Sequence, residues 1–243
     1  MLGKSKVKYI QSLGQKKLRD EEGLFIAEGP KIIVELLSSA HTHIQEMYAL
    51  SEWLDAHQQE LKNRPVIVVD EVELGRISQL STPNQVVAIV KKFDEPVVRV
   101  SNTVSLMLDG IQDPGNLGTI IRIADWFGVS QIICSRDCAD MYNSKVVQST
   151  MGSIARVKVL YTSLEEWLAG QQGIDIYATS LKGQDVTAMK PITEGIIVIG
   201  NESKGISADI MKRVTTSITI PKKGNAESLN AAVAAGIVLS HLV

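Results

Sequence analysis

Short apolar runs alternate with amphipathic stretches along almost the whole chain. In its first part, runs of four or five aliphatic or β-branched residues predict strands at residues 24–27, 46–50, 66–69 and 86–90. Helical patterns occupy residues 31–38 and 52–61. This alternation predicts a small α/β unit. A charged stretch ending in Pro96 follows the last strand, so residues 91–102 are the best linker and the boundary lies near residue 98.

The rest of the chain repeats the alternation on a larger scale. Strands are predicted at residues 104–108, 131–134, 157–160, 174–178, 196–199 and 217–220, and helical patterns separate most of them. Such a pattern predicts a mostly parallel sheet with helices on both faces. The fold class is therefore α/β, with one domain over residues 1–95 and a second over residues 99–243. Open sheets of this kind bind ligands beyond the carboxyl ends of their strands.

Composition narrows the class without identifying the chemistry. The 243 residues carry a formal net charge of −2, with 44% hydrophobic and 21% charged residues, which is typical of a globular protein and excludes collagen, coiled coil and disordered tails. Cys134 and Cys138 have no second pair and no nearby histidine, so neither a disulfide framework nor a metal site is expected. The longest apolar run, residues 231–239, is too short to span a membrane, and no signal-peptide run follows the N-terminus. We expect a cytoplasmic protein.

The N-terminus is distinctly basic. Residues 1–19 carry six Lys or Arg residues and no acid, which makes this arm a candidate contact for a polyanion such as RNA. The alternative is a solvated helix, because Val7, Ile10 and Leu13 can form an apolar stripe between the lysines.

Polar residues follow three of the predicted strands in the second half. After the first, Asn116 is a plausible N-cap of a helix whose apolar stripe leaves Arg122 outside it. After the strand at 196–199, Glu202 lies in a loop bounded by glycines and could accept hydrogen bonds, or simply be a solvated carboxylate in a tight turn. After the strand at 217–220, Ser228 and Asn230 precede an alanine-rich helix, where capping alone could explain Ser228. The combination is far more specific than any one segment.

Residues 116–122, 199–205 and 220–230 resemble the three motifs of the SpoU-type RNA ribose 2′-O-methyltransferases, a branch of the SPOUT class, in order and in spacing. Residues 22–29 and 81–88 look like the substrate-binding domain of that family, which has an L30e-like fold. The resemblance therefore covers nearly the whole chain. One departure is Ser203-Lys204, where many members carry a small residue first; the flanking motif residues remain.

The resemblance implies a deep trefoil knot in the C-terminal domain, a homodimer, and S-adenosylmethionine (AdoMet) bound in the knot. By position, AdoMet would be held around Thr179, Ser180, Leu181, Gly200, Asn201, Ile220, Ser228 and Leu229. The polar set around the ribose and its phosphate would be Asn116, Arg122, Glu202, Ser228 and Asn230, with Arg122 serving an active site shared between protomers.

The implied reaction is attack of a ribose 2′-hydroxyl on the methyl group of AdoMet, which needs in-line alignment and removal of the hydroxyl proton. In this family the arginine at the position of Arg122 is often regarded as the general base that removes this proton. Because a guanidinium has a pKa above about 12, an alternative is that charged Arg122 clamps the phosphate while another group or water takes the proton.

The resemblance favours large-subunit rRNA over tRNA as substrate, and guanosine as the modified nucleoside. A tRNA methyltransferase and a non-catalytic RNA-binding or ribosome-associated protein are the alternatives. A small-molecule enzyme with a nucleotide cofactor is disfavoured, because Gly110, Gly115 and Gly118 do not match the G-x-G-x-x-G fingerprint. With only 5% aromatic residues, RNA recognition would rely on phosphate contacts and shape.

Overall fold

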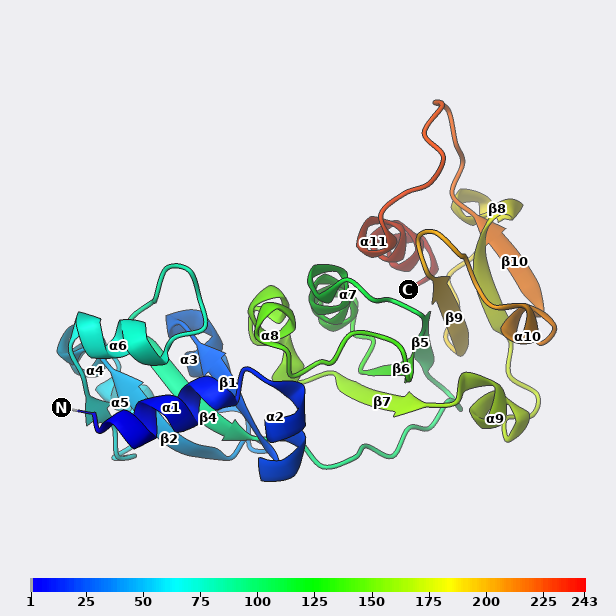
Figure 1. Cartoon of the computed structure of the whole chain (residues 1–243). Coiled ribbons are helices and arrows are strands. Elements are labelled where there is room, and N and C mark those ends of the chain that lie inside the picture. Colours follow the sequence, from blue (N-terminus) through cyan, green and yellow to red (C-terminus); the bar gives the residue numbers. More distant parts are fainter. Residues whose placement is uncertain (1) are drawn as a thin grey trace. The chain divides into compact units, whose positions relative to one another are not determined.

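The computed structural model describes residues 2–243 (Figure 1); Met1, the first residue of the basic arm, lies outside the described residues. The chain divides into two compact units. The first comprises the described residues up to Asp94 together with Asp140–Ala155, and the second comprises Glu95–Ala139 and Arg156–Val243. The segment Asp140–Ala155, which the sequence pattern placed in the C-terminal domain, therefore packs with the first unit.

The first unit is built on a four-stranded sheet with the order β1-β4-β2-β3. Strands β1 and β2 are antiparallel to β4, and β3 is parallel to β2. The strands are β1 (Leu24–Glu28), β2 (Ile44–Ala49), β3 (Ile67–Val68) and β4 (Val86–Lys91). The helices are α1 (Lys4–Ser12), α2 (Lys16–Glu22), α3 (Pro30–Ser38), α4 (Ser51–Ala56), α5 (Gln58–Leu61), α6 (Glu71–Ile77), α8 (Ser144–Thr150) and the 3₁₀ turn η1 (Ser153–Ala155).

Two helical features of this unit differ from the sequence pattern. The predicted helix at 52–61 is divided in two at His57, whose backbone angles are not helical. Helix α6 was not predicted, although its start carries a recognisable signal. Asp70 and Glu73 form a reciprocal capping box, which satisfies amides of the first turn.

The basic arm is part of the folded core. Ile10 and Leu13 are fully buried in the cluster that includes Tyr48 and Ile89. This is the apolar stripe expected of a helix that packs on the core with one face and exposes its lysines to solvent on the other. Arg19 is also buried, and its guanidinium donates to Asp140 at 2.7 Å. Lys6, Lys16 and Lys17 pair with acids of the same unit, at Glu46, Asp20 and Glu21. Four of the six basic side chains are thus neutralised internally, which leaves a smaller cationic surface than the sequence suggests.

The segment Asp140–Ala155 is fastened to the first unit by several contacts. The ring of Tyr142 packs on Phe25 with centroids 4.9 Å apart, and Gln148 Nε2 donates to the carbonyl oxygen of Glu28 at 2.9 Å. Gly152 has φ +97°, and a Cβ there would lie 2.5 Å from Cβ of Glu35 on α3. Only glycine fits that close approach.

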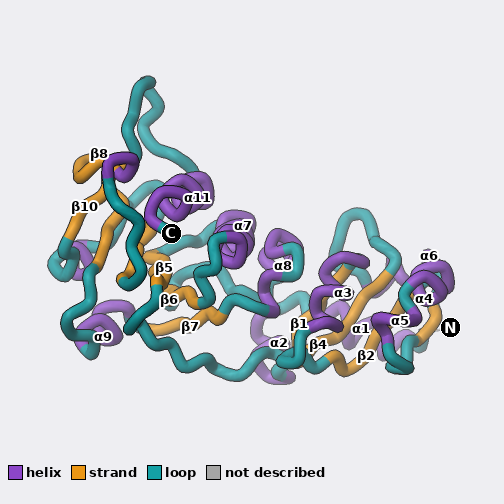
Figure 2. The backbone as a smooth tube through the Cα atoms, turned by 180° about the vertical axis from the view of Figure 1, so that it is seen from behind, coloured by secondary structure: helices purple, strands orange, loops and turns teal. Residues whose placement is uncertain are grey.

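The second unit holds a six-stranded sheet, whose strands are orange in Figure 2. The strand order is β10-β8-β9-β5-β6-β7, and every pair of neighbours is parallel. This confirms the predicted α/β class and the mostly parallel sheet. The strands are β5 (Val104–Asp109), β6 (Gln131–Ser135), β7 (Lys158–Thr162), β8 (Ile176–Asp185), β9 (Gly195–Gly200) and β10 (Thr216–Thr219). The helices are α7 (Pro114–Trp126), α9 (Leu164–Ala169), α10 (Ala208–Met211), α11 (Ala231–Leu242) and the 3₁₀ turn η2 (Val186–Ala188).

Helices cover both faces of this sheet. Leu164 of α9 and Ile210 of α10 pack in one cluster with Met107, Ile133 and Val198 of the strands. Successive strand residues point to opposite faces, and helix α11 packs on β9 and against α7 on the other face (Figure 1). A Cβ at Gly236 of α11 would lie 3.6 Å from the Cδ1 atom of Ile123, so the small residues of α11 allow the two helices to lie close together.

Candidate active site

The loops that follow β5 and β9 start side by side. Asp109 and Gly200, the last residues of these strands, are partners in the parallel ladder. The Nδ2 atom of Asn201 donates to the carbonyl oxygen of Gly110 at 2.7 Å, and its Oδ1 atom accepts from the amides of Ser203 and Lys204 at 2.9 and 3.0 Å. Asn201 therefore fixes its own loop and ties it to the neighbouring one.

A chain of hydrogen bonds then joins the three motifs. Asn116 donates from Nδ2 to the Glu202 carboxylate, and its Oδ1 atom accepts from Nδ2 of Asn230 at 2.8 Å. Asn116 and Glu202 are 86 positions apart, and Asn116 and Asn230 are 114 apart. The fold thus brings three of the five predicted polar residues into contact at the carboxyl edge of the sheet.

Helix α7 begins earlier than the sequence pattern indicated. Asp113, not Asn116, is its N-cap: the Asp113 carboxylate accepts from the amide of Asn116 at 2.8 Å. Pro114 occupies the first helical position, where its fixed φ and missing amide hydrogen cost nothing. Because Asn116 is not needed as the cap, its side chain is available to Glu202 and Asn230.

The cap of helix α11 is Asn230 rather than Ser228. The Oδ1 atom of Asn230 accepts from the amides of Ala232 and Val233 at 3.0 and 3.2 Å. Ser228 lies in the exposed stretch before the helix, and none of the described residues forms a hydrogen bond with its hydroxyl. Capping therefore does not explain Ser228, while Asn230 combines capping with its contact to Asn116.

Arg122 lies on the exposed face of α7, outside the buried stripe of Leu117, Ile120, Ile121 and Ala124. Its guanidinium makes no hydrogen bond or ion pair within residues 2–243, and the structure does not bring it to the Asn116 cluster. One turn further along the same helix, Trp126 is 83% exposed, and Val233 of the adjoining α11 is 50% exposed. The exposed residues of α7 and α11 thus include a cation without a polar partner and uncovered apolar side chains.

The segments expected to hold AdoMet lie in the middle of β8, at the end of β9 and after β10. The pairing of β8 with β10 slips between Ser217 and Ile218, so residues 179–183 bulge out of the ladder. A Cβ at Gly200 would lie 2.6 Å from the carbonyl carbon of Gly205, which requires glycine there. Leu181 and Leu229 are 76% and 45% exposed. Apolar side chains without a covering partner, beside loops with tight backbone approaches, fit a nucleoside-like ligand.

The remaining cofactor candidates make fewer contacts. Thr179 donates from Oγ1 to the carbonyl oxygen of Val198 at 3.0 Å, which anchors the start of the bulge to β9. Ser180 accepts from the amide of Lys182 within the bulge, and Ile220 is partly buried just past β10.

Cys138 supports this edge of the sheet in a way that the sequence did not reveal. Its sulfur accepts from the amide of Ile111 at 3.2 Å and donates to the carbonyl oxygen of Leu108 at 3.3 Å. The hydrogen bond from Cys134 lowers the pKa of the Cys138 thiol to about 7, with Ser135 and backbone amides acting in the same direction and burial opposing them. Both cysteines are free thiols.

Among residues 2–243, no group of three or more His, Cys, Asp or Glu side chains is placed to hold a metal ion. No helix within that range is long and apolar enough to cross a bilayer.

Profiles of known protein families match the sequences of both parts of the chain. The profile of the SpoU rRNA methylase family matches residues 103–240, and that of an MRM3-like substrate-binding domain matches residues 4–88. The chain belongs to the SpoU rRNA methylase family. The resemblance drawn from the three motifs is thereby confirmed, and with it the prediction of an RNA methyltransferase.

Individual relatives cover almost the whole chain. The 23S rRNA (guanosine(2553)-2′-O)-methyltransferase RlmP of Bacillus subtilis is 30% identical over 98% of this chain and 95% of its own length. The 23S rRNA (uridine(2479)-2′-O)-methyltransferase of Streptomyces viridochromogenes is 26% identical over 95% of this chain and 86% of its own. An AdoMet-bound rRNA methyltransferase from Sinorhizobium meliloti superimposes with a TM-score of 0.87 at 30% identity, covering 99% of this chain and 95% of that one.

Proposed function

We propose that this methyltransferase transfers a methyl group from AdoMet to a ribose 2′-hydroxyl of large-subunit rRNA. The observation that carries the proposal is the contact of Asn116 with Glu202 and Asn230, one residue from each motif. Their side chains are held by one another and by backbone, so a polar surface is organised before substrate arrives. Preorganisation of this kind is what alignment of a hydroxyl requires.

AdoMet, when bound, supplies the methyl group on its sulfonium centre. The bulge at residues 179–183, the Gly200 turn and the Ile220–Leu229 stretch are the segments proposed to hold it, with Asn201 fixing the central loop. Leu181 and Leu229 offer apolar surface, and backbone at Gly200 can approach a ligand closely. We also propose the family's trefoil knot for this region, because the resemblance places the cofactor within it.

Arg122 is proposed as a clamp for the substrate phosphate rather than as the base. Its guanidinium has no partner among the described residues, and a planar, permanently charged fork matches phosphate geometry. Trp126 on the same helix and Val233 on α11, which packs against α7, are also exposed. Burial of these side chains in a homodimer would cover apolar area and deliver Arg122 to an active site shared between protomers.

The proposed RNA is the 23S-type rRNA of the large subunit, because the named relatives that match most of the chain act on such RNA. One of them is named for guanosine and the other for uridine. Guanosine remains the proposed nucleoside here, because the relative named for guanosine is the more similar of the two to this chain. An rRNA substrate also agrees with the expected cytoplasmic location. The SpoU family includes tRNA enzymes, which makes tRNA the alternative.

The test is methyl transfer from radiolabelled AdoMet into unmodified rRNA and, separately, tRNA, followed by mapping of the label. Label on a ribose of rRNA supports the proposal, and label in tRNA alone selects the alternative. Arg122→Ala is the control. We expect loss of transfer with AdoMet affinity and the unfolding transition unchanged, because the side chain is exposed and has no polar partner among residues 2–243. Arg122→Lys should not rescue activity, since it lacks the fork. AdoMet binding without transfer to either RNA would refute the proposal.

A further inference from the structure

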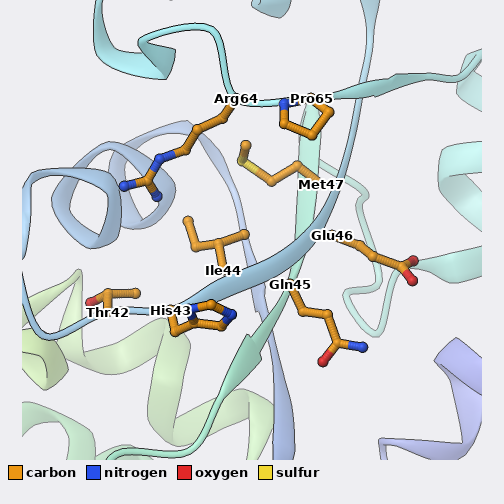
Figure 3. Close-up of a pocket in the computed structure, with 8 residues that line it drawn as sticks. All are labelled: Thr42, His43, Ile44, Gln45, Glu46, Met47, Arg64 and Pro65. Atoms are coloured by element: carbon orange, nitrogen blue, oxygen red, sulfur yellow. The ribbon is translucent and has the colours of Figure 1, made fainter.

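A pocket of about 310 Å³ lies in the first unit (Figure 3). The residues that line it are distant in sequence from those of the candidate active site. Residues 42–47, at the start of β2, form one wall, and Arg64 with Pro65 forms the other. Ile44, Met47 and Arg64 lie on one side of β2, whereas Glu46 extends away from them (Figure 3). The pocket thus has an apolar floor beside a guanidinium.

The strand that forms this wall keeps part of its backbone unpaired. Strand β3 pairs with β2 only at Tyr48 and Ala49. On that side, none of the described strands pairs with residues 44–47, and the ladder with β4 on the other side slips between Ile44 and Glu46. Unpaired backbone amides and carbonyls therefore border the pocket, ready to meet a ligand that can donate and accept hydrogen bonds.

The pocket is also cationic. Arg64 and His43 are exposed, and neither side chain has a hydrogen-bond or ion-pair partner within residues 2–243. Glu46, the acid of the lining, is engaged elsewhere: Lys6 Nζ donates to it at 2.7 Å, and the Tyr48 hydroxyl donates to its other oxygen. The positive charge of Arg64 is therefore not neutralised by an acidic side chain of the pocket.

Arg64 is presented by an unusual stretch of backbone. The two residues before it, Lys62 and Asn63, have φ of +47° and +63°, and neither is glycine. The amide of Arg64 closes the turn by donating to the carbonyl oxygen of Leu61 at 2.9 Å. Left-handed conformations at consecutive non-glycine residues are strained, and such strain concentrates at sites that bind ligands.

We propose that this pocket binds an unpaired nucleotide of the RNA substrate. The base lies against Ile44, Met47 and Pro65, its polar edge meets the free backbone of β2, and Arg64 holds the adjoining phosphate. Splayed-out single-stranded bases are the features that proteins read in RNA, and arginine supplies both a phosphate contact and a flat surface for stacking. The inference rests on the proposed function, because it takes RNA as the substrate.

The experiment uses the full-length protein and a short single-stranded RNA carrying 4-thiouridine. After irradiation, cross-linked peptides are mapped by mass spectrometry, and affinity is measured over a range of salt concentrations. We expect cross-links within residues 42–47 or 62–65. Arg64→Ala should weaken binding about tenfold and lower the salt slope by about one. Arg76→Ala, which removes an exposed arginine outside the pocket, is the matched control and should change neither the cross-links nor the pocket-dependent affinity.

Cross-links confined to other segments, no binding of the RNA, or equal affinities for the Arg64→Ala and Arg76→Ala proteins would overturn the inference. Both variants are expected to unfold at the wild-type temperature, so a loss of binding cannot be assigned to misfolding. Methyl transfer by the wild-type protein to rRNA separates the two proposals. Transfer without pocket cross-links refutes the pocket alone, whereas pocket cross-links without transfer to any RNA refute the proposed function alone.

Discussion

Replacing Asn230 by alanine and, in parallel, by aspartate separates two roles that this side chain performs together. Its Oδ1 atom caps helix α11, and its Nδ2 atom donates to Asn116. Alanine removes both. Loss of an N-cap costs about 1 kcal/mol, and loss of one exposed amide hydrogen bond about 0.5 kcal/mol. At about 2–4 °C per kcal/mol for a chain of this size, Asn230→Ala should lower the melting temperature by about 3–6 °C.

Aspartate keeps the cap oxygen, so Asn230→Asp should melt close to the wild-type temperature. It cannot donate to Asn116, however, and an aspartate beside Asn116 competes with Glu202 for the single amide group of that residue. Asn116 can then no longer be oriented by both neighbours. Methyl transfer should fall at least about tenfold in both variants, equivalent to about 1.4 kcal/mol of lost transition-state stabilisation.

The assays are differential scanning calorimetry and single-turnover methyl transfer at saturating AdoMet. Wild-type activity in the Asn230→Asp protein would refute the role given to the contact between Asn230 and Asn116. An unchanged melting temperature in the Asn230→Ala protein would refute the capping argument. Sedimentation of both variants checks that neither effect comes from a change in assembly.

Three further changes test other parts of the structure. Ile10→Ala should destabilise the first unit by about 2–5 kcal/mol in urea unfolding, because Ile10 is fully buried; a loss below 1 kcal/mol would contradict its place in the core. Gly200→Ala should weaken AdoMet binding more than about tenfold by calorimetry, because its Cβ would lie 2.6 Å from Gly205; retained affinity would mean that the loop yields easily. Burial raises the pKa of Glu28, so its protonated form is favoured in the folded state and the associated stability is lost as pH rises above about 4.5. Glu28→Gln should therefore gain stability relative to wild type between pH 4.5 and neutral, and a pH-independent difference would exclude this linkage.

Much of the fold follows from local pattern. The central strands of the second unit, β5, β6 and β9, are buried almost throughout and read as apolar runs, so their positions were recognisable. The burial of Ile120 and Ala124 and the exposure of Arg122 were recognisable as well. Helix α6 was missed because its apolar stripe is short, although the Asp70 capping box was present to be found. The sequence also could not indicate that Arg19 is buried, because its partner, Asp140, lies 121 positions away.

The candidate site divides along similar lines. Asn116, Glu202 and Asn230 were grouped by residue type and by their positions after strands, and parallel pairing of β5 with β9 places two of the three loops side by side. The observed N-caps differ from the predicted ones: Asp113 caps α7 in place of Asn116, and Asn230 caps α11 in place of Ser228. Which residue caps a helix depends on turn geometry that residue type alone does not fix. The supporting role of Cys138 depends on a tertiary contact with the loop after β5.

The membership of Asp140–Ala155 in the first unit bears on how modular this protein is. Tyr142 covers Phe25, Asp140 neutralises buried Arg19, and Gln148 holds the backbone of β1. A fragment that ends near residue 95 would leave a buried charge without its partner and an aromatic ring uncovered, at a cost typical of a broken buried ion pair, about 3–5 kcal/mol. The first unit therefore cannot be transplanted by exchanging the N-terminal residues alone. A chimaera would have to carry Asp140–Ala155 with them, so the two units are constrained to change together.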